Sequence, residues 1–477
     1  MKNLMVLLGF LSAATCTRAQ QLNGTWEGNI SVKEQLIPII FHLKTDSKIY
    51  KASFDSPSQK AFNIPCSGVE TRNDSIIISM ASINGSYAGK ISADEQSMEG
   101  TWKQGNAALP LNIRKTSDQA NMLTAKRPQT PKPPFPYTSE NIEYSNADHT
   151  IRFGATITVP PVNKPGEKFP AILLITGSGQ QDRDENIMEH KPFAILADEF
   201  TKKGMIVLRV DDRGMGKTTG SFNKSTSADF ANDVEAGINY LKTRTDVNLQ
   251  KIGLLGHSEG GMIAPMVAAR RNDIDFIILL AGPGIPINNL MTEQYAAVAA
   301  GQTSSKLLVK AASDLYHTIT TTVINNPDSA EIYQRALLAT EAWADTTPKT
   351  ILSALQLTDK PARAKYVASM LQTFMAPWFR YFLAYDPQAN LRKLQSKVLA
   401  LNGSRDIQVL ATSNLAGIKA ALEKSKSPAY EVHEMAGMNH LFQTCKKCTV
   451  TEYGELEESF SPEALALIST WLTKNVL

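Results

Sequence analysis

A serine at position 258 has the surroundings of a catalytic nucleophile. Residues 256–260 read Gly-His-Ser-Glu-Gly and fit the pattern G-x-S-x-G. A short apolar run at 251–255 precedes the pattern, and residues 261–271 have the composition of a helix. A strand, a sharp turn and a helix in this order form a nucleophile elbow, which raises the serine hydroxyl above a parallel sheet. The glycines at the two ends of the pattern let the backbone turn without steric clashes. We therefore predict Ser258 as a nucleophile.

A serine hydroxyl is a weak nucleophile at neutral pH, so it needs a general base and a carboxylate that orients the base. On a sheet of this kind the acid, and then the histidine, follow the serine along the chain. Three histidines follow it: His317, His433 and His440. His440 lies in a loop pattern just after the strand-like run 430–435. His433 lies inside that run, and His317 lies in a helical-looking stretch before any candidate acid. We therefore predict His440 as the base.

The predicted acid is Asp406. It lies in the turn that leaves an apolar strand at 397–401. In parallel α/β sheets, ligand sites lie beyond the carboxyl ends of the strands, where Ser258 is also expected. The alternative is Asp386, which precedes a strand instead of following one, and we therefore favour Asp406.

These motifs resemble those of the α/β-hydrolase superfamily, from about residue 139 to the C-terminus. More narrowly, the chain resembles secreted bacterial carboxylesterases that carry an additional N-terminal β domain. The resemblance implies a serine hydrolase that needs no metal or organic cofactor. Five segments carry it: the elbow at 256–261, the acid turn at 402–409, the histidine turn at 437–440, an Asp-Asp-Arg-Gly-Met-Gly run at 211–216 and the run at 177–185.

Acyl transfer places negative charge on the carbonyl oxygen, and two N–H donors aimed at this oxygen stabilise it. One donor is expected to be the backbone N–H of Glu259, directly after the nucleophile. The other is expected from the loop after the apolar strand 171–175. By resemblance, this second donor is Ser178 or Gly179. Many relatives carry His-Gly at the start of this loop, where the present chain has Thr-Gly.

The composition is that of an ordinary globular protein, with 43% hydrophobic and 20% charged residues. A length of 477 residues is enough for two or three domains. The formal net charge is +3, and the lysines and arginines are scattered along the chain. Because nucleic-acid binding needs clustered basic residues, we expect no nucleic-acid partner.

The first residues have the pattern of a secretory signal peptide. Lys2 gives a positive start, and the apolar run at 4–14 is too short to span a bilayer. Thr17 and Ala19 are small residues at positions −3 and −1 of a signal-peptide site, so we predict cleavage after Ala19. We therefore expect a secreted or periplasmic protein, with lipoprotein anchoring at Cys16 as the alternative. No later segment is long and apolar enough to cross a membrane.

Cleavage after Ala19 would leave three cysteines, Cys66, Cys445 and Cys448, of which at least one is unpaired. In an oxidising compartment, Cys445 and Cys448 can form a small disulfide that stiffens the loop after His440. The alternative is two free thiols on a surface loop. A zinc site at this pair would lack ligands, so we expect no metal.

The chain divides into distinct compositional regions after the expected signal peptide at 1–19. Residues 20–115 contain alternating strand patterns separated by turn residues and predict a small all-β domain. Two Gly-Thr-Trp repeats in it place Trp26 and Trp102 in its expected core. Residues 116–138 are proline-rich and predict an extended linker.

Residues 139–477 predict the catalytic domain. From residue 151 onwards, strand and helix patterns alternate, which implies a mostly parallel, doubly wound sheet. One interval, at about 286–392, has helical periodicity and no clear strand. We expect it to form a helical cap over the active site, with exposed aromatic residues such as Trp378 and Phe382 walling the substrate pocket.

Together these features predict an α/β-hydrolase fold and a secreted serine esterase that acts on small-molecule esters. A peptidase, another amidase or an acyl thioesterase remains an alternative because the same triad cleaves those bonds. A non-catalytic protein whose β domain binds a glycan or lipid is a further alternative. The sequence does not indicate the oligomeric state or the acyl chain length.

Overall fold

The computed structural model describes residues 22–32, 35–46, 49–56, 61–105, 107–116, 127–326 and 329–477. The expected signal peptide, with Cys16, lies outside these residues. The chain divides into two compact units, Met1–Thr124 and Ala125–Leu477, and each is described by itself. No helix in the described ranges is long and apolar enough to cross a membrane.

The first unit is an antiparallel β-sheet, as the turn-rich alternating pattern predicts. Its strand order is β4-β3-β2-β1-β9-β8-β7-β6-β5. Trp26 and Trp102 are both buried in its core, where Trp102 packs edge-on against Phe54. The predicted core role of the two tryptophans is confirmed. The strands are β1 (Gly24–Val32), β2 (Gln35–Asp46), β3 (Ile49–Ser56), β4 (Ala61–Pro65), β5 (Gly68–Arg72), β6 (Ser75–Met80), β7 (Gly85–Ile91), β8 (Ser97–Gln104) and β9 (Ala107–Thr116).

The second unit is built on an eight-stranded sheet with the order β10-β11-β13-β12-β14-β15-β16-β17. The strand β11 pairs antiparallel with both β10 and β13, and the remaining pairs are parallel. The predicted mostly parallel sheet is therefore confirmed. Its strands are β10 (Thr138–Ser145), β11 (Arg152–Val159), β12 (Phe169–Ile175), β13 (Ile206–Val210), β14 (Val247–His257), β15 (Phe276–Leu280), β16 (Lys397–Gly403) and β17 (Tyr430–Met435).

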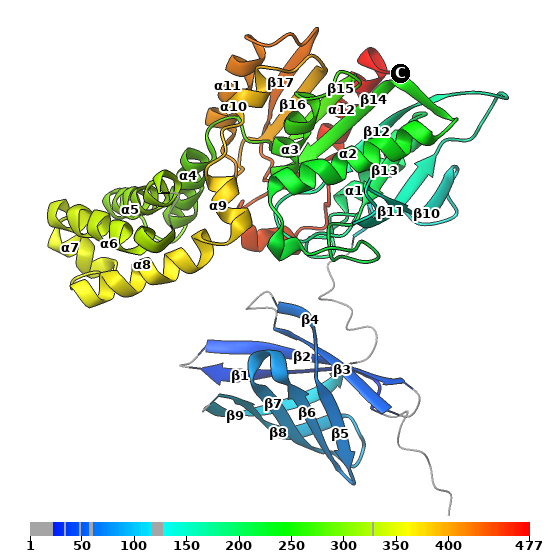
Figure 1. The fold of residues 1–477 in the computed structure, drawn as a ribbon. Helices are drawn as coiled ribbons and strands as arrows, with labels where there is room; N and C mark the ends of the chain where they lie inside the picture. Colours follow the sequence, from blue (N-terminus) through cyan, green and yellow to red (C-terminus); the bar gives the residue numbers. More distant parts are fainter. Residues whose placement is uncertain are drawn as a thin grey trace, which may run out of the picture. The chain divides into compact units, whose positions relative to one another are not determined.

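Helices cover both faces of this sheet (Figure 1). On one face, α2 (Ser227–Thr243), α3 (Glu259–Ala268) and α11 (Ala411–Leu422) bury apolar side chains against the strands. On the other face, α1 (Pro192–Lys202) and α12 (Pro462–Asn475) do the same. The central strands are apolar on both faces because both are covered, as parallel sheets require. This rigid sheet holds the loops at its carboxyl edge.

The helical insertion between β15 and β16 forms a subdomain with its own apolar core. Its helices α5 to α8 lie beside one end of the sheet in Figure 1, and α9 lies nearer to the sheet. The short helix α9 contacts α2 and the 3₁₀ helix η5 (Phe222–Lys224). Its helices are α4 (Ile287–Ala300), α5 (Lys306–Asn325), α6 (Ser329–Thr346), α7 (Lys349–Ala354), α8 (Lys360–Phe374), α9 (Pro377–Leu383) and α10 (Gln388–Leu391).

The expectation that Trp378 and Phe382 are exposed is wrong. Phe382 is buried in the core on the α2–α3 face of the sheet, and Trp378 is half-buried and stacks on Phe382 with ring centroids 5.2 Å apart. Both residues lie on α9, at the junction between the cap and the catalytic sheet. The aromatic cluster therefore joins the helical insertion to the sheet.

Residues 127–137, which the sequence assigns to the linker, pack within the second unit. Arg127 donates to the carbonyl oxygens of Leu456, Met188 and Gly454 at 2.7–3.0 Å. Tyr137 donates to a carboxylate oxygen of Asp198 at 2.8 Å. Within the second unit this segment is thus held by hydrogen bonds.

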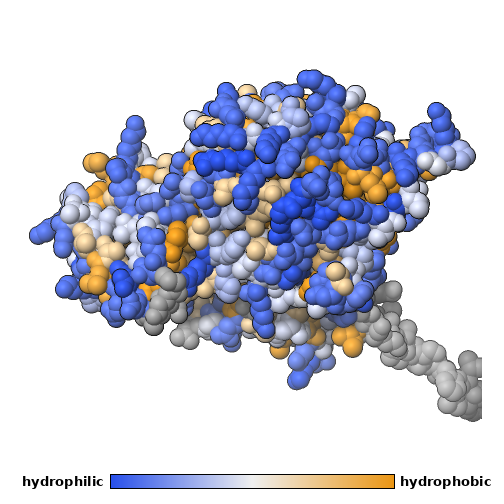
Figure 2. Space-filling model, turned by 45° about the horizontal axis from the view of Figure 1, so that its top comes forward, coloured by the Kyte–Doolittle hydropathy of each residue, from blue (hydrophilic) through white to orange (hydrophobic). Residues whose placement is uncertain are grey.

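The molecular face drawn in Figure 2 is mostly hydrophilic, with hydrophobic side chains in small groups.

Candidate active site

The elbow around Ser258 joins β14 directly to α3. Strand β14 ends at His257 and helix α3 begins at Glu259, so the serine alone makes the turn. Its φ of 53° and ψ of −116° are unusual for a residue with a side chain. Such strain persists only where the surrounding structure imposes it, and it is typical of functional sites. A Cβ atom on Gly256 would lie 2.0 Å from the carbonyl oxygen of Gly260, so only glycine permits this turn.

Asp406 and His440 meet at the same edge of the sheet. Asp406 follows β16 and His440 follows the adjacent parallel strand β17. The distance from His440 Nδ1 to Asp406 Oδ2 is 2.7 Å, and both side chains are almost fully buried. The other oxygen of Asp406, Oδ1, accepts the backbone N–H groups of Gln408 and Val409 at 2.7 and 2.9 Å. These bonds fix the carboxylate so that it orients the imidazole.

The other residues considered from the sequence lie elsewhere. His433 projects from β17 and contacts Glu431, with a ring nitrogen 3.1 Å from the carboxylate. His317 lies on α5 and contacts the hydroxyl of Thr292 at 3.0 Å. Asp386 is exposed, and its carboxylate accepts the N–H of Gln388 at the start of α10. The structure pairs none of these three with His440 or Ser258.

The loop that carries His440 is held by its own hydrogen bonds. The side-chain oxygen of Asn439 accepts the N–H groups of Leu441 and Gln443 at 3.0 Å each. Cys445 and Cys448, which follow, are joined in a disulfide. This resolves the open choice between a disulfide and two free thiols, and Cys66 is the free cysteine of the described residues. The loop is therefore constrained on both sides of His440.

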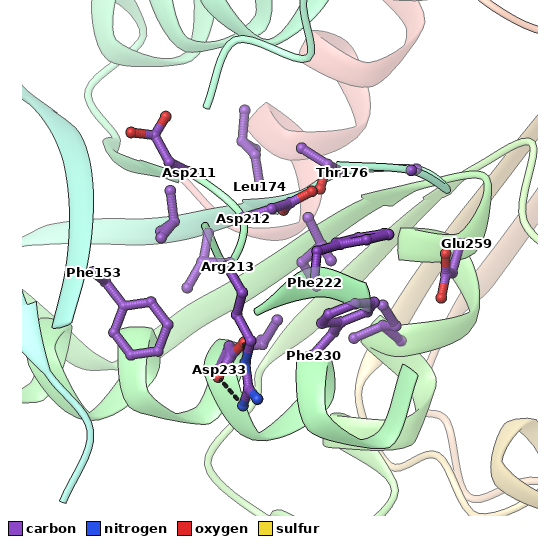
Figure 3. Close-up of a pocket in the computed structure, with 17 residues that line it drawn as sticks. Phe153, Leu174, Thr176, Asp211, Asp212, Arg213, Phe222, Phe230, Asp233 and Glu259 are labelled. Atoms are coloured by element: carbon purple, nitrogen blue, oxygen red, sulfur yellow. Dashed lines mark hydrogen bonds and ion pairs between the residues drawn. The ribbon is translucent and has the colours of Figure 1, made fainter. Parts of the chain in front are cut away.

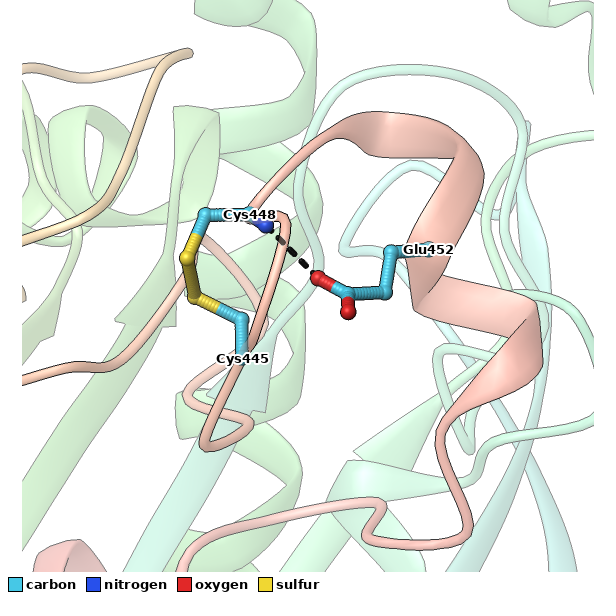
Figure 4. A group of neighbouring side chains, drawn as sticks. All are labelled: Cys445, Cys448 and Glu452. Carbon is cyan, nitrogen blue, oxygen red and sulfur yellow. Dashed lines mark hydrogen bonds between the residues drawn. A yellow bond between two sulfur atoms is a disulfide. The ribbon is translucent and has the colours of Figure 1, made fainter.

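The carboxylate of Glu452 supports the same loop (Figure 4). It accepts the backbone N–H groups of Lys446, Lys447 and Cys448 at distances between 2.6 and 3.2 Å. One ligand atom from Glu452 and each of the two cysteines lie within 4.8 Å of one another, a spacing that suits a metal ion. In the disulfide state, however, the sulfurs are not thiolates, and the carboxylate is already used by three donors.

A second buried pair lies directly behind the serine. His257 Nδ1 is 2.9 Å from Oε1 of Glu185, and His257 Nε2 is 3.0 Å from the carbonyl oxygen of His440. Because a carboxylate and a carbonyl only accept, both ring nitrogens donate when Glu185 is ionised, and this arrangement favours the imidazolium form of His257. Burial by itself lowers the pKa of His257, but the charge and hydrogen bond of Glu185, the carbonyl of His440 and the charge of Asp406 together raise it.

This pair was missed in the sequence, where the run 177–185 supports the resemblance but gives Glu185 no role. The carboxylate oxygen Oε1 of Glu185 also accepts the N–H of Gly177 at 2.7 Å. A Cβ atom on Gly177 would lie 3.2 Å from Cβ of Ser258, so the loop passes close to the nucleophile. Glu185 thus connects this loop to the elbow, and the N–H of Gly177 is not available as an oxyanion donor.

A pocket lies beside this loop (Figure 3). Its apolar wall includes Phe222 and Phe230, which stack with centroids 5.1 Å apart. Its polar wall includes Asp212 and Glu259, and Arg213, which pairs with Asp233 at 2.6 Å. Burial, together with the neighbouring charges of Glu259 and Glu185, raises the pKa of Asp212 to about 7. Ser258, Asp406 and His440 are not among the residues that line this pocket, which adjoins the elbow through Gly177 and Glu259.

Comparison with protein families places these residues in a wider context. The model of the family described as "Serine aminopeptidase, S33" matches residues 188–443, more than half of the 477-residue chain. The chain belongs to the serine aminopeptidase S33 family. This confirms the α/β-hydrolase resemblance, and esterases and peptidases are both among the relatives of this S33-family protein.

Two relatives illustrate this range. Esterase EstD of Thermotoga maritima is 33% identical over 138 residues, which are 29% of the S33-family chain and 32% of the esterase. Human dipeptidyl peptidase 8 is 29% identical over 129 residues, which are 26% of the chain and 14% of the peptidase. The chain thus spans a third or less of the length of these relatives. The crystal structure of a Pyrococcus furiosus esterase covers 74% of the chain and 99% of its own length, with 13% identity and a TM-score of 0.42.

Proposed function

We propose that this protein is a serine hydrolase that cleaves carboxylic ester bonds through an acyl-enzyme. The single observation that carries the proposal is the 2.7 Å contact between His440 Nδ1 and Asp406 Oδ2, in a loop that also hydrogen-bonds His257 next to Ser258. Ser258 is the nucleophile, His440 the general base and Asp406 the residue that orients the base.

The reaction follows from these roles. With its proton on Nδ1 and directed to Asp406, the imidazole of His440 presents Nε2 to the hydroxyl of Ser258. The serine oxygen attacks the ester carbonyl while Nε2 takes its proton, and Asp406 stabilises the resulting imidazolium. His440 then gives this proton to the departing alcohol, which leaves the acyl group on Ser258. A water molecule, deprotonated by His440, hydrolyses the acyl-enzyme and restores the serine.

The oxyanion is held by backbone N–H groups in this proposal. Glu259 opens helix α3, where the first N–H groups have no acceptor within the helix. The helix dipole also favours negative charge at this end. The second donor is the N–H of Ser178 or Gly179, because Glu185 already accepts that of Gly177.

Identity to an esterase over 138 residues supports the choice of an ester as the small-molecule substrate. A peptidase is the second candidate, favoured by the S33 family model and the match to dipeptidyl peptidase 8. Both candidates use the same triad, so only the substrate distinguishes them. An exported protein is also part of the proposal, and the disulfide of Cys445 and Cys448 suits an oxidising compartment.

The test is the rate of hydrolysis of p-nitrophenyl acetate, longer p-nitrophenyl esters and aminoacyl-anilides by the full chain and by Ser258→Ala. We expect ester hydrolysis to exceed anilide hydrolysis, and the alanine variant to lose roughly 10³-fold or more in kcat with an unchanged circular dichroism spectrum. A folded Ser258→Ala variant within about tenfold of the parent would refute the nucleophile. Preferential anilide cleavage would refute the esterase in favour of the peptidase.

A further inference from the structure

Glu259 follows the proposed nucleophile and is buried, with 2% of the residue exposed. Its Oε1 atom accepts hydrogen bonds from Ser227 Oγ at 2.6 Å and from Trp378 Nε1 at 2.8 Å. The hydroxyl of Ser178 interacts with the same carboxyl group and lowers its pKa. The two donors come from the start of α2 and from cap helix α9, and Ser178 lies in the loop after β12.

A carboxylate at this position carries an electrostatic cost. Burial raises the pKa of Glu259, because the charged form is separated from water. Among the residues that the structure describes, no Lys, Arg or His forms an ion pair with it. Its charge also lies on the residue whose N–H is proposed to hold an oxyanion, so it opposes the negative charge that develops there. A smaller apolar residue would avoid both costs, and the retained carboxylate therefore needs an explanation beyond packing.

We propose that Glu259 is a positioning residue whose carboxylate fixes the loop of Ser178 and cap helix α9 against the nucleophile elbow. This inference rests on the proposed function, because it assigns the loop of Ser178 to the oxyanion hole. In this proposal the hydroxyl of the exposed Ser178 binds the carboxylate of Glu259, and this bond restricts the direction of the backbone N–H of Ser178. Trp378 attaches the cap to the same acceptor, so the cap and the oxyanion loop share one anchor.

The inference distinguishes Glu259 from a residue that only stabilises the fold. An oxyanion donor aimed about 1 Å away from its target loses much of its effect on the transition state while ground-state binding changes little. The removal of the anchor should therefore lower kcat and leave KM nearly unchanged. A purely structural role would lower the unfolding temperature and the fraction of active enzyme, without this division between kcat and KM.

The first experiment compares Glu259→Gln, which keeps an acceptor oxygen, with Glu259→Leu, which removes it. We expect Glu259→Leu to lower kcat for p-nitrophenyl acetate by about 10- to 100-fold, since a lost oxyanion donor costs about 10²- to 10³-fold. The glutamine variant should recover at least half of this loss on a logarithmic scale. Active sites are counted with a fluorophosphonate label on Ser258, so that kcat refers to competent enzyme.

The second experiment tests the donors. Ser178→Ala removes the hydroxyl but keeps the backbone N–H, and Trp378→Phe removes the indole donor but keeps an aromatic ring. Each should lower kcat at least about threefold, and each should have a smaller effect when combined with Glu259→Leu than alone. Trp343→Phe is the matched control, because Trp343 is another half-buried tryptophan of the cap, on α6.

Two results would overturn the inference. One is a kcat within about threefold of the parent for both Ser178→Ala and Trp378→Phe. These two variants test the inference even if Glu259→Leu does not fold. The other is full additivity of either donor substitution with Glu259→Leu, since residues that share one anchor must be coupled. A failure of the proposed function is recognised separately, by full activity of Ser258→Ala.

Discussion

The substitution Glu185→Ala would test whether the buried pair behind the nucleophile holds the active site together. Glu185 is 1% exposed, and its Oε1 atom accepts from both His257 and the N–H of Gly177. The alanine variant leaves the imidazolium of His257 and the N–H of Gly177 without this acceptor. We therefore expect both a loss of stability and a displacement of the loop beside Ser258.

The magnitude follows from the burial of both partners. Removal of one member of a buried ion pair costs roughly 3–5 kcal/mol, because the other charge is left uncompensated. The unpaired N–H of Gly177 would add about 1–3 kcal/mol to this cost. Deprotonation of His257 would remove its uncompensated charge and so offset part of the total cost. We therefore expect the free energy of unfolding to fall by about 3–5 kcal/mol, a large share of the roughly 5–15 kcal/mol of a typical domain.

The assay is urea unfolding followed by tryptophan fluorescence and circular dichroism, with Glu189→Ala as the control. Glu189 is exposed and, like Glu185, has a positive φ, at 67° against 52°. The two alanine substitutions therefore meet the same backbone strain, and only one removes the buried acceptor. Equal losses for the two variants, or a loss below about 1 kcal/mol for Glu185→Ala, would refute the reasoning.

The pH dependence gives a second check on the same pair. Because the folded pKa of His257 is raised above its unfolded value of about 6.5, the pair contributes its full stability below that pH. The contribution declines as the pH rises through the folded pKa. The difference in stability between the parent and Glu185→Gln should thus be larger near pH 6 than near pH 9. A difference that grows with pH would show that His257 is neutral in the folded protein.

Three further predictions concern the acid, the disulfide and the cap. Asp406→Asn should lower kcat on the order of 10³-fold or more. Asp386→Asn should change kcat less than about threefold, because the carboxylate of Asp386 accepts only from Gln388. Steady-state kinetics on the folded variants distinguish the two acids. The double substitution of Cys445 and Cys448 by serine should lower stability by roughly 2 kcal/mol, as expected for a four-residue loop, and calorimetry with and without reductant checks it. Trp378→Ala should alter the ratio of acetate to long-chain ester hydrolysis, and an unchanged ratio would contradict a pocket wall at α9.

The sequence predicts the positions of the candidate residues that directly follow a strand. Ser258, Asp406 and His440 each follow a strand that ends at the same edge of the sheet, so strand order alone brings their turns together. The contact between His440 and Asp406 was predicted from that argument and is present in the structure. The exposure of Phe382 was predicted wrongly, because helical periodicity does not indicate which neighbouring element covers an aromatic side chain.

The partners of Glu185 and Glu259 could not be predicted from the sequence, because they lie far away along the chain. Glu185 meets His257 across 72 positions, and Trp378 meets Glu259 across 119. Both acids are buried next to Ser258, yet Glu185 has a cationic partner whereas Glu259 has only neutral donors. Glu185 contacts a ring nitrogen of His257, while Glu259 accepts hydrogen bonds from Ser227 on α2 and Trp378 on α9. In this proposal Glu259, which has no counter-charge, couples the cap to the nucleophile. A substitution on α9 should therefore change kcat even though α9 does not contact Ser258.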